Sequence, residues 1–189
     1  LDLEQVGIMG HSFGGYTAFA LAGAPLNDPR LDTCAAMNLT LNPSVILQCR
    51  ADYLPRSNQI LSDPRIQAVI AVNPIDSTVF CLDNMAQIEI PTMMVAGSND
   101  LLAPAIEEQI HPFIWLGSEN KYLALMVPGT HSSTSSDVIN AQMPNLLSSP
   151  RPDLGRSYLK AISLAFFETH LRQRPEFEAY LSSAYAEAI

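Results

Sequence analysis

The stretch Val6-Gly7-Ile8-Met9-Gly10-His11-Ser12-Phe13-Gly14-Gly15 decides the fold. An apolar run precedes Gly-His-Ser-Phe-Gly, and a run of small and apolar residues follows it. This pattern predicts a strand, a sharp turn and a helix, with Ser12 at the apex. The glycines two positions before and after Ser12 favour a turn that a Cβ atom would obstruct. Such a nucleophile elbow would place the serine hydroxyl near a helix N-terminus, where free N–H groups favour developing negative charge. The alternative is a glycine-rich turn that binds phosphate or only packs tightly.

Strand-like and helix-like segments alternate along the rest of the chain. Apolar runs predict strands at 3–9, 66–72, 91–96 and 121–127, the first of them buried. Helical patterns cover 13–24, 104–116 with a break at Pro112, 155–172 and the segment from Pro175 onward, while 132–152 is expected to be a loop. This alternation predicts an α/β fold, a mostly parallel sheet flanked by helices. Polar residues that follow strand ends would meet at one edge of the sheet, namely Ser12, Asn73, Asp76, Asp100 and His131.

The segment 26–65 is broken by five prolines if Pro25 is included, and Asn and Asp recur in it. We interpret 1–189 as a single domain in which 26–65 is an insertion that covers the site like a lid. An ordinary long surface connection is the alternative.

The composition of the chain argues against several kinds of partner and cofactor. The net charge of −9 and the scattered basic residues argue against nucleic acid. The apolar runs are shorter than the ~20 residues of a membrane span. The histidines and three cysteines lack zinc-site spacing, so no metal is expected. A disulfide between Cys34 and Cys49 would favour an exported or periplasmic protein, whereas two buried thiols are the alternative.

A serine hydroxyl needs a base within hydrogen-bond reach to act as a nucleophile. His131 follows a predicted strand and a Pro-Gly turn, after a serine and an acid in the order Ser, Asp, His, and we assign it as the general base. His11 is expected to point away from the elbow apex. His111 and His170 lie in predicted helices and are expected to be surface or partly buried helix residues.

Two carboxylates are candidates for the acid that orients the histidine. Asp100 follows the third predicted strand and Asp76 the second, and either could instead serve a turn or cap a helix. We prefer Asp100. The backbone N–H of Phe13 is the expected oxyanion donor. A second donor normally comes from a loop after an earlier strand, which this chain does not contain.

Three segments resemble the α/β-hydrolase superfamily, esterase and lipase type: GHSFGG at 10–15, PTMMVAGSNDLLAP at 91–104 and KYLALMVPGTH at 121–131. The acid and histidine segments resemble bacterial cutinase-like polyester hydrolases, whose acid matches Asp100. The elbow and SYLKAISLAFFETHLRQRPEFEAYL at 157–181 resemble platelet-activating-factor acetylhydrolases and predicted dienelactone hydrolases. The acetylhydrolase acid matches Asn73, which is not an acid, and this departure favours Asp100.

The resemblance covers the C-terminal half of the family fold and implies a serine-dependent carboxylic ester hydrolase that works through an acyl-enzyme without a cofactor. Its substrate would be a small-molecule or lipid-like ester. Hydrolysis of a thioester, lactone or amide is an alternative, and so is a catalytically incompetent half-domain. Leu1 would mark a truncation, or else a homo-oligomer contact or a second polypeptide would cover the edge strand at 3–9.

Overall fold

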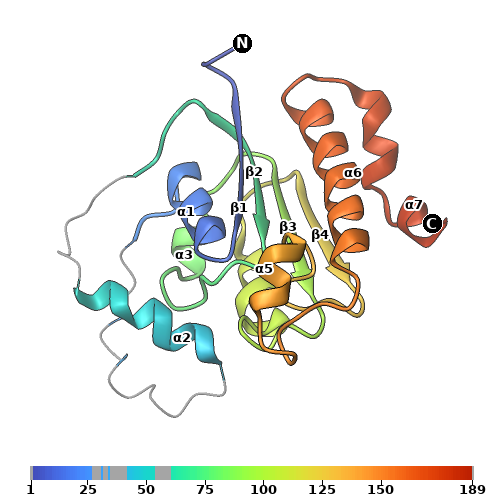
Figure 1. Ribbon diagram of the computed structural model, residues 1–189. Helices are drawn as coiled ribbons and strands as arrows, with labels where there is room; N and C mark the ends of the chain where they lie inside the picture. The colour runs from blue at the N-terminus through green and yellow to red at the C-terminus, as the bar shows by residue number, and fades with distance from the viewer. Residues whose placement is uncertain (1, 27–30, 32–33, 35–41, 54–60, 189) are drawn as a thin grey trace.

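The computed structural model describes residues 2–26, 31, 34, 42–53 and 61–188. Four parallel strands form one sheet in the order β1 (Val6–His11), β2 (Ile66–Val72), β3 (Thr92–Gly97) and β4 (Lys121–Met126), as Figure 1 shows. The predicted α/β class is therefore confirmed. Because all four strands run the same way, the loops after them gather at one edge of the sheet.

The two central strands agree with the sequence, whereas β1 differs. β2 and β3 are buried along nearly their whole length, as their continuous apolar runs predict. The predicted buried strand at 3–9 begins instead at Val6 and is only half-buried. Within the described residues β1 pairs with β2 alone, and Met9 is 50% exposed. Its position at the sheet edge explains the difference, since one flank has no neighbouring strand to cover it.

Helices cover both faces of the sheet (Figure 1). On one face Phe19, from α1 (Phe13–Ala22), packs with Val69 and Met94, and α3 (Leu82–Met85) and α4 (His111–Trp115) complete this layer. On the other face Phe166, from α6 (Pro152–His170), packs against alternate residues of β2 and β3. Each fully buried phenylalanine contributes about 1.5–3 kcal/mol relative to an exposed one.

Three predicted segments differ in the structure. The helix expected at 104–116 is divided into a π-helical turn, η3 (Ile106–Ile110), and α4. The loop expected at 132–152 contains a short helix, α5 (Asp137–Gln142), whose N-cap Ser136 accepts a hydrogen bond from the Ile139 N–H. The last helix is a 3-10 helix, η4 (Pro175–Leu181), followed by α7 (Ser183–Ala188). Its apolar residues stay largely exposed because they lie beside α6 at the periphery.

The insertion is described in part. Within 26–65 the structure describes α2 (Pro43–Gln48) and η2 (Cys49–Tyr53), and a disulfide joins Cys34 to Cys49. The remaining stretches, 27–30, 32–33, 35–41 and 54–60, lie outside the described residues, so the lid interpretation stays a prediction.

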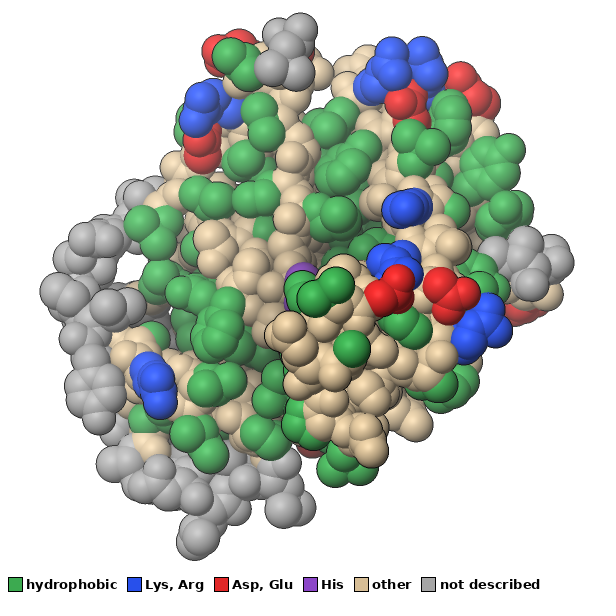
Figure 2. Space-filling model, viewed as in Figure 1, with side chains coloured by type: hydrophobic (Ala, Val, Ile, Leu, Met, Phe, Trp, Pro, Cys, Tyr) green, Lys and Arg blue, Asp and Glu red, His purple; other side chains and the backbone are tan. Residues whose placement is uncertain are grey.

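Charged side chains pair on the surface. On the face in Figure 2 the basic side chains lie mostly beside acidic ones, and ion pairs join Arg151 to Asp153 and Arg156 to Asp137. Across the described ranges, no helix is long and apolar enough to cross a membrane.

Candidate active site

Ser12 occupies a strained turn between β1 and α1. Its backbone has φ 57° and ψ −119°, a conformation that costs a non-glycine residue of order 1–3 kcal/mol. Hydrogen bonds hold the turn: the Ser12 N–H donates to the Val72 carbonyl at 2.9 Å, and the Gly15 N–H donates to the Ser12 carbonyl at 2.9 Å. Strain that the surrounding structure maintains is typical of functional sites.

The close contacts of the elbow fall on two glycines, one of which differs from the prediction. A Cβ atom on Gly10 would overlap the Gly14 carbonyl, and one on Gly15 would lie 2.8 Å from Pro74 Cβ. A Cβ atom on Gly14 would meet nothing within 4 Å. The steric requirement expected at Gly14 therefore belongs to Gly15, which packs α1 against the loop after β2.

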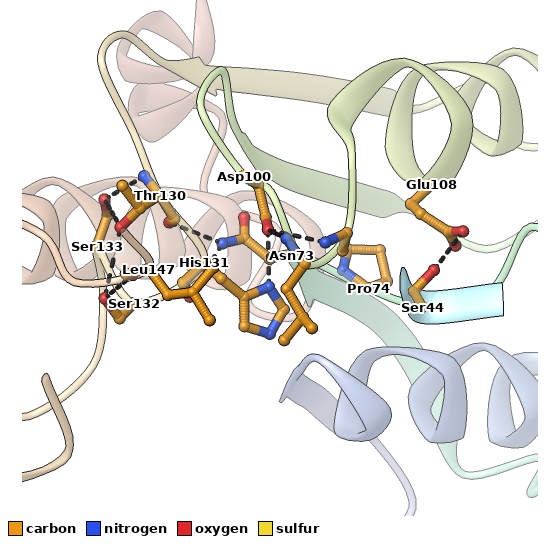
Figure 3. Close-up of polar contacts among 12 residues, drawn as sticks. Ser44, Asn73, Pro74, Asp100, Glu108, Thr130, His131, Ser132, Ser133 and Leu147 are labelled. Carbon is orange, nitrogen blue, oxygen red and sulfur yellow. Dashed lines mark hydrogen bonds and ion pairs between the residues drawn. The ribbon is translucent and has the colours of Figure 1, made fainter. Parts of the chain in front are cut away.

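The structure brings together His131 and Asp100. Nδ1 of His131 lies 2.7 Å from Oδ2 of Asp100, with side-chain exposures of 4% and 0% (Figure 3). Because a carboxylate accepts, Nδ1 carries a proton, and in the neutral ring Nε2 is then the nitrogen with the lone pair. The other oxygen, Oδ1, accepts from the N–H groups of Leu102 and Ala103 at 2.9 and 2.8 Å. Asp100 thus orients the histidine and caps the following turn at once.

Asp76, the second candidate acid, lies at the same edge of the sheet but in a different loop from Asp100. It is fully buried in the loop after β2, where its backbone N–H donates to Oε2 of Glu108 at 2.8 Å. The Nδ1 atom of His131 is paired with Asp100, so Asp100 has the geometry that the orienting acid requires.

Two further side chains reach the His131 backbone, and the sequence did not reveal either contact. His11 Nε2 lies 2.8 Å from the His131 carbonyl oxygen, and the two rings are 4.8 Å apart. This contact turns the ring of His11 toward the histidine loop, whereas the sequence predicted only that it points away from the elbow apex. Asn73 Nδ2 donates to the same oxygen at 3.2 Å and to the Thr130 carbonyl at 3.1 Å. The pKa of His11 is lowered, first by desolvation of its ring and then by repulsion from His131.

The elbow and the histidine loop are in contact through His11, the residue before Ser12. No hydrogen bond between the Ser12 hydroxyl and the His131 ring is formed in the described structure, and such bonds are often long before a substrate binds. Phe13 begins α1, so its N–H is among those that a helix leaves without an internal partner. Its side chain is 48% exposed.

A buried carboxylate links the insertion to the loop after β2. Glu108 accepts from Ser44 and Gln48 of α2 and from the backbone and hydroxyl of Ser77. Figure 3 shows Ser44 facing Glu108. Gln48 in turn accepts from the Thr78 N–H at 2.6 Å. These bonds fix α2 against the same loop that carries Asn73 and Pro74.

The remaining histidines lie in helices, as expected. His111 is exposed and stacks on Trp115, and His170 Nε2 lies 3.1 Å from the Tyr122 hydroxyl. No group of three or more His, Cys, Asp or Glu residues suited to a metal ion occurs within 2–26, 31, 34, 42–53 and 61–188.

Comparison with known proteins rests on structure. No protein-family model and no curated protein matches the sequence. An acylaminoacyl peptidase in complex with Z-Gly-Gly-Phe-chloromethyl ketone superposes with a TM-score of 0.51 and 17% identity, over 90% of this chain and 24% of that chain. Two further structures, of Pyrococcus horikoshii acylaminoacyl peptidase, match at TM-scores of 0.49 with 17% and 19% identity. They cover 90% of this chain and 24% and 25% of theirs.

The chain has the fold of the α/β-hydrolases, a parallel sheet covered by helices on both faces. It spans about a quarter of the length of the similar peptidase chain. At this identity the likeness establishes the fold alone.

Proposed function

We propose that the protein is a serine hydrolase in which Ser12 is the nucleophile, His131 the general base and Asp100 its orienting acid. The buried His131–Asp100 pair is the observation that supports the proposal, because Asp100 occupies Nδ1 and leaves Nε2 to act as the base. The histidine loop also contacts His11, the residue before the strained Ser12. Three separate strand ends, those of β1, β3 and β4, contribute these groups, as expected for a site built on a parallel sheet.

The reaction follows from these roles. The Ser12 oxygen attacks an acyl carbonyl while His131 Nε2 takes its proton, and the Phe13 N–H donates to the oxyanion. His131 then protonates the leaving group. A water molecule, deprotonated by His131, attacks the acyl-serine, and the acid is released as Ser12 regains its proton.

An ester is the favoured acyl bond. Phe13 follows Ser12 in the sequence, and Leu101 follows Asp100. Both apolar side chains are 48% exposed and would contact an apolar acyl or alcohol group of the substrate. We propose a carboxylesterase or lipase-like activity on small or lipid-like esters, as the esterase resemblance implies, with the 26–65 insertion shaping the acyl pocket. Amide hydrolysis is the second candidate, because the similar structure is a peptidase.

Hydrolysis of short-chain p-nitrophenyl esters by wild type and Ser12→Ala tests the proposal. Ser12→Ala should abolish turnover, and Ser157→Ala, an exposed serine on α6, is the matched control. Activity of Ser12→Ala near that of wild type would contradict the assignment. Matched thioesters and p-nitroanilides then separate ester from other acyl specificity.

A second candidate function, which is not enzymatic, is that of a protein-interaction module without catalytic turnover. The half-exposed edge strand β1 favours it, since an open edge can pair with a second chain or a second copy of this one. An inactive wild type that sediments as a complex would support this reading.

A further inference from the structure

The backbone carbonyl of His131 is held from two neighbouring strand ends. His11, the last residue of β1, and Asn73, directly after β2, both bond to this one oxygen at 2.8 and 3.2 Å. A carbonyl oxygen accepts, so His11 donates through Nε2–H and is in the Nε2-protonated tautomer when neutral.

The ring of the same residue is held from a third strand end. Asp100 follows β3 and bonds Nδ1, while His131 itself follows β4. β4 lies at the far side of the described sheet from β1, so the histidine loop reaches across the ends of the intervening strands. Asp100 fixes the ring of His131, as Figure 3 shows. His11 and Asn73 fix its backbone.

The burial, backbone conformation and hydrogen bonds of Asn73 all suit a contact with the His131 carbonyl. It is 3% exposed, and its backbone lies in the left-handed region at φ 41°, which asparagine tolerates better than most residues. Its amide nitrogen donates to the backbone carbonyls of Thr130 and His131. We infer that His11 and Asn73 are positioning residues that fix His131 through its carbonyl oxygen. This inference rests on the proposed function, since it assigns His131 the role of base.

Asn73→Asp tests the contact with little change of shape. It replaces the donating amide by an accepting oxygen that faces two carbonyls. Because a misplacement of about 1 Å can cost 10²-fold in rate, kcat should fall about 10- to 100-fold with KM within about twofold. Asn120→Asp makes the same change at an exposed site before β4, at the opposite end of the sheet, and should match wild type.

Substitutions of His11 test the other hydrogen bond to the His131 carbonyl oxygen without adding a charge. His11→Leu should lower kcat, and His11→Gln, which keeps a side-chain N–H, should lose less. Equal losses for Leu and Gln would show that the ring packs rather than donates, and would overturn the role of His11.

Solvent exchange of the His131 Nδ1 proton, measured by NMR, separates this inference from the proposed function. Exchange should be at least about tenfold faster in Asn73→Asp and His11→Leu than in Asn120→Asp. Faster exchange in a protein without hydrolytic activity would support the contact and remove the proposed function. Unchanged exchange, or faster exchange with unchanged kcat in an active enzyme, overturns the inference.

Discussion

Nδ1 of His131 lies 2.7 Å from Oδ2 of Asp100, and both side chains are almost fully buried. Water therefore cannot compete for either atom, and the histidine ring has one preferred orientation. The pair explains how a residue after β4 and a residue after β3 act as one unit.

Asp100→Asn should preserve the fold but prevent His131 from acting as the general base. An asparagine oxygen can still accept from Leu102 and Ala103, as Oδ1 does now. Its NH2 group would face Nδ1 and favour the wrong histidine tautomer, so kcat should fall about 10³- to 10⁴-fold. Steady-state ester hydrolysis measures this. A loss below tenfold would show that another acid, with Asp76 the first to examine, orients His131.

Glu108→Gln should destabilise the protein more than any surface substitution. The new amide nitrogen would face N–H and hydroxyl donors, leaving buried groups without acceptors. The expected loss is about 2–4 kcal/mol in the free energy of unfolding, measured in urea. The neighbouring exposed Glu107→Gln is the control and should change it by less than about 0.5 kcal/mol. Equal stability of the two variants would contradict the prediction that Glu108 holds α2 in place.

Cys34→Ser should reveal the contribution of the disulfide. The two cysteines are separated by 15 residues, for which the chain-entropy model gives about 3 kcal/mol. Thermal unfolding of Cys34→Ser should match that of the reduced wild type. Cys81→Ser changes a free, half-buried thiol and should leave the midpoint near the wild-type value. A reduced wild type as stable as the oxidised one would contradict the prediction.

His170 should make stability depend on pH. Burial lowers its pKa below 6.5, and Glu178 opposes this in part. The unfolded chain therefore binds a proton near pH 6.5 before the folded chain does, so stability is lost as pH falls below that value. The unfolding midpoint should drop between pH 7.5 and 5.5 by less in His170→Gln than in wild type. Identical drops would show that His170 does not contribute.

The central part of the fold was readable from the sequence because its residues are buried on both faces. The run at 66–72 coincides with β2, and the run at 91–96 differs from β3 by one residue at each end. At the edges the pattern is weaker. β1 begins three residues later than predicted, and η4 replaces an α-helix, since neither is enclosed by neighbours.

The sequence could propose site residues only where the proposal depends on local pattern. Ser12 is proposed from its flanking glycines, and His131 from its place after a strand. The choice between Asp100 and Asp76 depends on distances across the sheet edge, which one sequence does not contain. The contacts of His11 and Glu108 join residues 120 and up to 66 positions apart, so no local pattern signals them.

Covalent labelling with a fluorophosphonate probe tests the central claim most directly. Peptide mapping by mass spectrometry should find the label on Ser12 in wild type, with little or none in His131→Ala. This result would show an activated serine that depends on its base. An unlabelled wild type, or equal labelling of Ser12 in both proteins, would contradict the account.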